Sequence, residues 1–269
     1  MILPAIPRRP IPPARRLTQL TILLPLLAGV ALAGCGVNAA LRLTDEELLG
    51  LGQTLLERKS YEQSREVLEQ LHKTFPGSPL APTAQITIGE SYYRQKRYSD
   101  AATEYSNFLR YYPAHAQAAE AQYFLALSRF KTTYGPERDQ TQTREARDVF
   151  QQLLDRYPDS GYEKEAKEKL TELDTRLAEH ELAVARFYLS DRECEAAEKR
   201  LHGVLDDYPG ISVEPQAMYE LGRSYLCLKR QEEAVATFRE LVTAHPRTAS
   251  AGRARVMLAK LDSKAKAES

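Results

Sequence analysis

The sequence predicts an all-α fold, a tetratricopeptide-like superhelix of five helical hairpins, chiefly from one repeated signal. An aromatic residue or histidine followed by proline recurs five times, and proline ends a helix because it has no amide hydrogen to donate. Repetition with such a period is typical of helical solenoids. No segment alternates apolar and polar residues as a half-buried strand does. The five pairs are Phe75-Pro76, Tyr112-Pro113, Tyr157-Pro158, Tyr208-Pro209 and His245-Pro246.

Small and aromatic residues recur at matching places before these prolines. The second and fifth units share one spacing, and it is the spacing of tetratricopeptide repeats. We expect the small residues where the two helices of a hairpin approach most closely, with an aromatic ring filling the space beside them. The second unit has Gly89, Tyr92, Ala101, Tyr105 and Pro113, and the fifth has Gly222, Tyr225, Ala234, Phe238 and Pro246.

Two intervals between the prolines are longer than the others, and each predicts an insertion. Between Pro113 and Pro158 the surplus falls around residues 134–137, which predicts a long loop inside the third hairpin. Between Pro158 and Pro209 the segment from Tyr162 to about Leu189 contains neither Gly nor Pro. This segment predicts one overlong helix in the fourth unit.

The N-terminus has the three parts of a secretory signal peptide. Arginines precede a short apolar stretch, and Leu32-Ala33-Gly34-Cys35 resembles the lipobox of bacterial lipoproteins. We therefore expect residues 1–34 to be removed, Cys35 to carry lipid, and residues 35–43 to form a tether to the membrane. Gly36 rather than aspartate follows the cysteine, which favours the outer membrane. An ordinary secretory signal with a chance cysteine is the alternative.

Charge and cysteine content exclude some classes of function. Removal of residues 1–34 takes away four of the 37 Lys and Arg and none of the 37 Asp and Glu, which leaves a net charge of about −4. No basic surface for phosphate neutralisation is visible, which argues against nucleic-acid binding. The envelope permits a disulfide between Cys194 and Cys227. Small buried thiols are the favoured interpretation, and the pairing stays open.

The sequence contains no complete catalytic or metal-binding motif, so we expect no enzyme, no metal and no cofactor. His180-Glu181 begins like a helical zinc-protease motif, but Val184 stands where the second histidine is required. The histidines are scattered and pair with no cysteine at ligand spacing. No nucleophile has the signature of a nearby base.

A protein-binding surface is the more promising route to function. In the first helix of the second and third units, residues at i, i+4 and i+7 share one helical face. A largely apolar, aromatic face suits an extended or amphipathic peptide. The same side chains could instead pack between neighbouring hairpins, and both interpretations stay open. The candidate groove consists of Ile86, Glu90, Tyr93, Tyr123, Leu127 and Phe130.

One long stretch of the chain resembles a known family. It begins with Glu137-Arg138-Asp139-Gln140-Thr141, continues through Tyr157-Pro158-Asp159-Ser160 and Arg176-Leu177-Ala178, and ends at Asp207-Tyr208-Pro209. With the long loop and the overlong helix, these residues resemble the BamD family, the tetratricopeptide lipoproteins of the β-barrel assembly machinery. The resemblance extends from residue 43 to about residue 254.

The resemblance implies a non-enzymatic scaffold, lipid-anchored at the periplasmic face of the outer membrane. Repeats 1–3, residues 44–158, would receive unfolded β-barrel proteins. Repeats 4–5, residues 159–262, would bind BamA beside the other components of the complex. Arg200 matches an arginine with which the family contacts BamA. Residues 263–269 are expected to be a frayed tail.

A different kind of envelope protein is the alternative function. Tetratricopeptide lipoproteins that coordinate cell-wall or division machinery have regular repeats and usually an N-terminal coiled coil. This chain has a lipobox and uneven repeat lengths instead.

The chain also departs from the BamD family pattern at two places. Residues 76–80 lack two aromatic residues and Ala116 replaces a proline, and both departures lie in the substrate-binding half.

Overall fold

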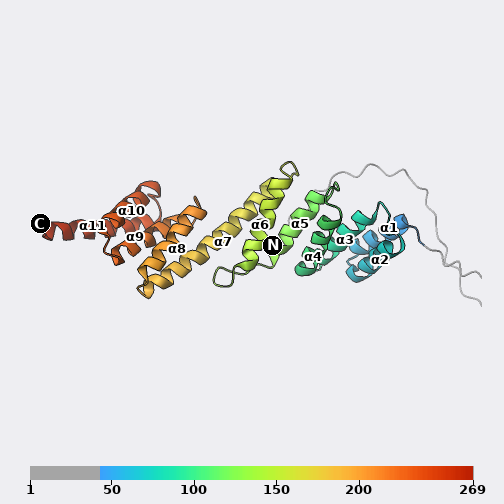
Figure 1. Ribbon diagram of the computed structural model, residues 1–269, viewed down its shortest axis with the longest axis horizontal. Coiled ribbons are helices and arrows are strands. Elements are labelled where there is room, and N and C mark those ends of the chain that lie inside the picture. The colour runs from blue at the N-terminus through green and yellow to red at the C-terminus, as the bar shows by residue number, and fades with distance from the viewer. Residues whose placement is uncertain (1–42, 269) are drawn as a thin grey trace, which may run out of the picture. The chain divides into compact units, whose positions relative to one another are not determined.

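The structure, a computed structural model, describes residues 43–268, and every regular element in that range is an α-helix. Ten of the eleven helices form five hairpins, and the last helix packs against the fifth (Figure 1). The predicted all-α repeat fold is therefore confirmed. The helices are α1 (Asp45–Glu57), α2 (Tyr61–Thr74), α3 (Ala81–Arg94), α4 (Tyr98–Tyr111), α5 (Ala118–Lys131), α6 (Thr141–Arg156), α7 (Glu163–Ser190), α8 (Cys194–Asp207), α9 (Glu214–Cys227), α10 (Gln231–Ala244) and α11 (Ala249–Glu268).

Four of the five hairpins turn in the same way, through a residue in the left-handed region. In the first hairpin this residue is Lys59, with φ of 62°. The amide of Ser60 donates to the carbonyl of Leu55 at 2.9 Å, which satisfies a carbonyl at the end of α1. The third hairpin differs, because residues 132–140 form the longer loop that the sequence predicted. The equivalent left-handed residues are Lys96, Arg192 and Lys229.

Within a hairpin, a small residue on one helix lies against a large side chain on the other. A methyl group added at Gly89 would lie 2.9 Å from Cε1 of Tyr105, closer than any real contact allows. A methyl group added at Gly222 would collide with Phe238 in the same way. Both aromatic side chains are fully buried. The small residues are therefore required by the close approach of the two helices.

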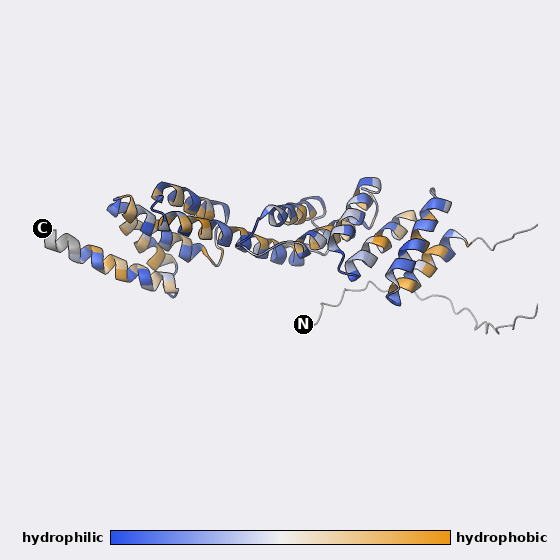
Figure 2. Cartoon of the chain, turned by 90° about the horizontal axis from the view of Figure 1, so that it is seen from below, coloured by the Kyte–Doolittle hydropathy of each residue, from blue (hydrophilic) through white to orange (hydrophobic). Residues whose placement is uncertain are grey.

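The core consists of four buried apolar clusters, and each one spans neighbouring hairpins. The first joins α1 to α3, the second α3 to α5, the third α5 to α7, and the fourth α7 to α11. Figure 2 shows the apolar residues as stripes on the helices, with polar residues between them. Because each cluster ends on the helix where the next begins, no hairpin has a core of its own.

The overlong helix predicted in the fourth unit is α7, with 28 residues. Its first half belongs to the third cluster and its second half to the fourth. The loop at 132–140 lies against it, since the His180 Nδ1 atom is 2.7 Å from the carbonyl oxygen of Pro136. Arg147 on α6 also pairs with Asp174 on α7 at 2.5 Å. The additional turns of α7 therefore form the surface against which the long loop packs.

The structure corrects the favoured interpretation of the cysteines as free thiols. Cys194 and Cys227 form a disulfide, with their Cα atoms 6.1 Å apart. Cys194 is the first residue of α8 and Cys227 the last of α9. They meet because α8 packs against α9 across the junction between two hairpins, which the spacing of two cysteines in the sequence does not reveal.

The last helix extends to the end of the described region. Helix α11 continues to Glu268 and so includes residues 263–268, and the fraying expected for residues 263–269 stays a prediction. The helix persists because Ala and Lys, which fill this segment, are good helix formers. The helices pack continuously across residue 158, where we expected the boundary between the two halves, because α6 lies against α7. None of the described helices combines the length and apolarity needed to cross a membrane.

The left-handed turns generate a prediction about stability. Replacing Lys59 by glycine should stabilise the fold by about 1 kcal/mol, because a side chain in the left-handed region costs roughly 1–2 kcal/mol and glycine pays none of this cost. Urea unfolding would measure the change. Lys167→Gly, at an exposed position in the second turn of α7, is the control and should destabilise by about 1 kcal/mol. Equal losses in both variants would contradict the argument.

Candidate protein-binding surfaces

Only four of the six groove candidates are accessible in the structure. Ile86 on α3 is 6% exposed and Phe130 on α5 is 9% exposed, and each belongs to an apolar cluster. The other four side chains, Glu90, Tyr93, Tyr123 and Leu127, are half-buried. For Ile86 and Phe130 the structure therefore shows packing between hairpins.

Cationic side chains from α7 approach Phe130. The ammonium nitrogen of Lys169 lies 4.4 Å from the centre of the Phe130 ring, and the guanidinium carbon of Arg176 lies 5.7 Å from it. Cations within this distance of an aromatic face are attracted to it. A bound peptide would have to displace these cations to reach the ring, so Phe130 is a poor candidate for the groove.

Tyr93 and Tyr123 belong to a row of four aromatic rings, which we call the aromatic row. Phe124 lies edge-to-face with both tyrosines, with ring centres 5.7 Å from Tyr93 and 5.4 Å from Tyr123. Tyr123 also stacks on Tyr162 at 4.3 Å. Phe124 and Tyr162 were not among the predicted residues, because a periodic pattern follows one face of one helix at a time. The row therefore extends from α3 across α5 to the residue that precedes α7.

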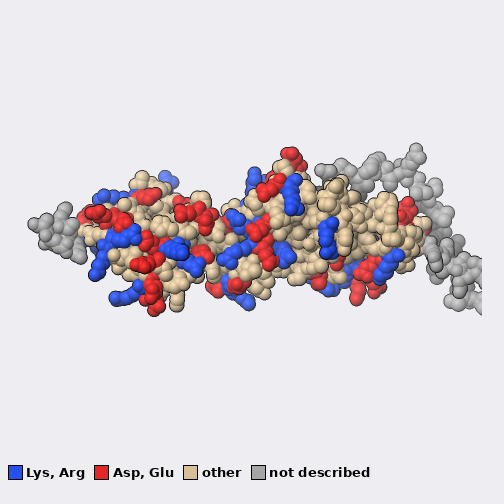
Figure 3. All heavy atoms as spheres, in the orientation of Figure 1, with Lys and Arg blue, Asp and Glu red and all other residues tan. Residues whose placement is uncertain are grey.

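The aromatic row is polar at its hydroxyl groups, and the carboxylates of Glu165 and Glu168 lie near Tyr123. Burial raises the pKa of Tyr93 and of Tyr123 to about 12, so both hydroxyls keep their protons at neutral pH and can donate to a peptide carbonyl. Glu90 is paired with Arg94 at 2.6 Å. The face drawn in Figure 3 has few charged side chains over α3 to α5. An uncharged peptide segment suits this surface.

Arg200 lines a concavity of about 620 Å³ between α6, α7 and α8. Cationic side chains outnumber carboxylates among its polar lining, which therefore attracts a negatively charged group. The residues that matter for its chemistry are Arg144, Glu181, Tyr188, Lys199, Arg200 and Asp207.

The carboxylate that faces Arg200 comes from α7. Arg200 Nη1 donates to Glu181 Oε2 at 2.8 Å, and Arg144 lies 3.8 Å from the other oxygen of Glu181. The hydrogen bond and the charge of Glu181 raise the pKa of Arg200. Its side chain is nevertheless 46% exposed, so part of it is accessible to a partner. The sequence showed no acidic neighbour on the same helix, and the partner on α7 became visible only in the structure.

Other expectations lie outside these two surfaces. Residues 1–42, which include Cys35 and the signal peptide, lie outside the described residues. Within the part that the structure describes, no group of three or more His, Cys, Asp and Glu side chains is arranged to hold a metal ion.

Comparison with known proteins gives one consistent result. Three relatives named outer membrane protein assembly factor BamD align with most of the chain. The one from Rickettsia prowazekii is 28% identical over 68% of this chain and 73% of its own length. The one from Caulobacter vibrioides is 26% identical over 78% and 70%. The one from Neisseria meningitidis serogroup B is 26% identical over 84% and 92%.

A solved structure and a family model complete the comparison. The thermophilic tetratricopeptide protein TTC0263 from Thermus thermophilus is 18% identical, with a TM-score of 0.34 over 81% of this chain and 98% of that chain. The model of the YfiO family, described as outer membrane lipoprotein, matches residues 42–235. The chain therefore belongs to the YfiO family of outer membrane lipoproteins, in which its relatives are named BamD.

Proposed function

We propose that this chain is a non-enzymatic scaffold of the outer-membrane β-barrel assembly complex, anchored through lipid on Cys35 at the periplasmic face of the outer membrane. Its membership of a family whose relatives are named assembly factors is the observation that carries the proposal. Two surfaces of different chemistry on one stack of hairpins fit a scaffold, which has to bind more than one protein.

The N-terminal hairpins would bind segments of unfolded β-barrel proteins. The aromatic row offers ring faces and protonated tyrosine hydroxyls, and Glu90 beside Tyr93 is already paired with Arg94. Such a surface can contact apolar side chains and donate to backbone carbonyls of an extended segment. Phe124 and Tyr162 therefore join Tyr93 and Tyr123 as candidate contacts.

The C-terminal hairpins would bind BamA through the concavity at Arg200. Glu181 occupies one part of the guanidinium, and the Arg200 side chain is 46% exposed, so another part stays accessible to a partner. A carboxylate from a partner can therefore share Arg200 with Glu181. Lys199 and Arg144 add positive charge around the same concavity.

Purification from detergent-solubilised envelopes separates this function from the alternative. A tagged chain should recover BamA and other components of the assembly complex. Recovery of cell-wall or division proteins without BamA would instead support an envelope coordinator of that machinery.

A first prediction concerns the aromatic row. Tyr93→Ala and Tyr123→Ala should each weaken crosslinking to barrel C-terminal peptides at least about threefold, because a stacked ring contributes about 0.5–1.5 kcal/mol beyond its buried area. Circular dichroism should show unchanged helicity. Tyr111→Ala is the matched control, since Tyr111 is 64% exposed and lies outside the row. A loss of stability of about 3–5 kcal/mol would show that the tyrosine is a core residue.

A second prediction concerns Arg200. Arg200→Glu should reduce recovery of BamA at least about tenfold, because a like charge would meet the partner's carboxylate as water leaves. Circular dichroism and thermal unfolding should confirm that the variant folds, since the change also places a second carboxylate beside Glu181, which is only 18% exposed. Arg110→Glu on α4, whose hydrogen-bond partners are uncharged, is the control. Normal recovery of BamA with Arg200→Glu at moderate salt would remove Arg200 from the interface.

A third prediction concerns the anchor. Cys35→Ser should remain unprocessed or appear in the soluble periplasmic fraction, because no other thiol stands next to the predicted cleavage site to receive lipid. Mass spectrometry of the mature N-terminus is the measurement. An unlipidated N-terminus in the wild-type protein would refute the lipid anchor.

A further inference from the structure

The junction between the first two hairpins has the same construction as the junction between the last two. Corresponding positions follow from the repeat pattern. Tyr92 corresponds to Tyr225 and Arg97 to Arg230, while Ser64 and Leu68 on α2 correspond to Ala197 and Leu201 on α8. The residue after the small packing residue therefore also corresponds in the two junctions. It is Arg65 in the first junction and Glu198 in the second.

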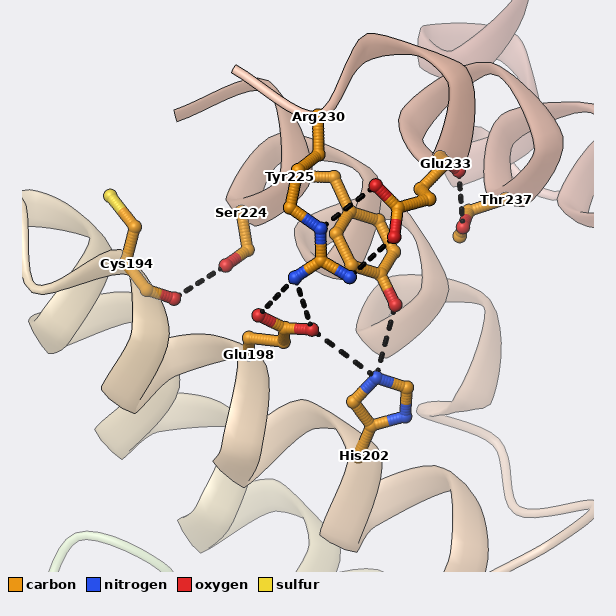
Figure 4. Close-up of polar contacts among 8 residues, drawn as sticks. All are labelled: Cys194, Glu198, His202, Ser224, Tyr225, Arg230, Glu233 and Thr237. Atoms are coloured by element: carbon orange, nitrogen blue, oxygen red, sulfur yellow. Dashed lines mark hydrogen bonds and ion pairs between the residues drawn. The ribbon is translucent and has the colours of Figure 1, made fainter. Parts of the chain in front are cut away.

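At the second junction, one arginine lies between two carboxylates. Arg230 Nη1 is 2.8 Å from both oxygens of Glu198, and Arg230 Nε is 2.8 Å from Glu233 (Figure 4). Its guanidinium carbon lies 4.6 Å from the centre of the Tyr225 ring. His202, one turn after Glu198, reaches the Tyr225 hydroxyl at 3.0 Å. The carboxylate of Glu198 thus fills a position between α8 and the ring of Tyr225.

At the first junction, a second cation takes the place of that carboxylate. The guanidinium carbons of Arg65 and Arg97 lie 4.2 Å and 4.7 Å from the centre of the Tyr92 ring. Arg97 is paired with Asp100 at 2.8 Å, as Arg230 is with Glu233. Arg65 is only 6% exposed. The carboxylate that would complete the arrangement is absent from this junction.

The hydrogen bonds of Arg65 leave its charge uncompensated. Its Nη1 atom donates to the uncharged Ser91 hydroxyl at 3.2 Å and Gln95 amide oxygen at 3.0 Å. Among residues 43–268 no carboxylate forms an ion pair with it, and Glu62 acts on Arg97 only through space. Buried guanidinium groups are normally paired. The Nε and Nη2 edge, which bonds to no described residue, has the geometry that binds a carboxylate through two hydrogen bonds.

We propose that Arg65, assisted by Arg97, binds a carboxylate of a docked protein segment at the Nε and Nη2 edge of its guanidinium. The ligand can be a chain terminus or an acidic side chain, since both present the same group. A carboxylate is favoured because its two oxygens match the two parallel donors of this edge, and because Arg65 has no carboxylate partner among residues 43–268. The proposal does not require that the segment come from a β-barrel protein.

Thermal unfolding with acetate as the probe tests the site directly. In wild-type protein, replacing chloride by acetate at constant ionic strength should raise Tm by about 2–4 °C. Arg65→Glu should remove this response and melt no lower than the wild type in chloride, because the new carboxylate would pair with Arg97. Arg58→Glu, an exposed change at the end of α1, should keep the response. Loss of stability in Arg65→Glu, together with equal acetate responses in all three proteins, would overturn the proposal.

Two further measurements identify the source of the carboxylate and guard against misfolding. Peptides that bind the wild type are compared as free acids, as C-terminal amides and with Glu changed to Gln. A tenfold loss on amidation identifies a chain terminus, a tenfold loss on Glu→Gln identifies a side chain, and no loss in either refutes the site. If Arg65→Glu does not fold, Arg97→Gln replaces it, since Arg97 is exposed. The acetate response involves neither BamA nor a barrel substrate, so it can fail or succeed independently of the proposed function.

Discussion

The contact between a small residue on the first helix of a hairpin and a large ring on the second is the constraint on which the stack depends. Gly89 against Tyr105 and Gly222 against Phe238 leave no room for a methyl group, so each pair holds its two helices at one separation. A fixed separation lets each hairpin present apolar faces at its two sides, and neighbouring hairpins share apolar clusters through these faces. Charged residues between the clusters are then free to differ from one repeat to the next.

The length of α7 separates the two surfaces that we assign to different partners. One half of the helix completes the cluster of α5 and α6, and the other begins the cluster that continues to α11. Tyr162, just before α7, ends the aromatic row, whereas Glu181, five turns later, faces Arg200. A helix of ordinary length would bring these features close together. Each surface can therefore be occupied while the other stays free.

Features that depend on period and composition could be predicted from the sequence. The five prolines marked the hairpins, and the long interval before Pro209 marked α7. Features that depend on neighbouring hairpins could not. The disulfide between Cys194 and Cys227, and the ion pair between Glu181 and Arg200, join residues on different helices whose relative rotation no linear pattern encodes. For the same reason the sequence placed Phe130 in a groove although α7 brings cations over it.

The two equivalent junctions show where specificity can enter a repeated fold. Their apolar residues, their tyrosine and their arginine agree, because these residues set the approach of the helices. Arg65 and Glu198 differ in sign at one position, and the fold accepts both because each lies beside a tyrosine ring and an arginine. With Glu198, the opposite charges at the junction pair with each other and link two hairpins. With Arg65 a buried cation keeps one edge without a partner, a state that is stable only if the desolvation cost is met by apolar packing or by a ligand. The N-terminal junction can therefore bind a carboxylate from a partner, whereas the C-terminal junction contains its own carboxylate, which stabilises the fold.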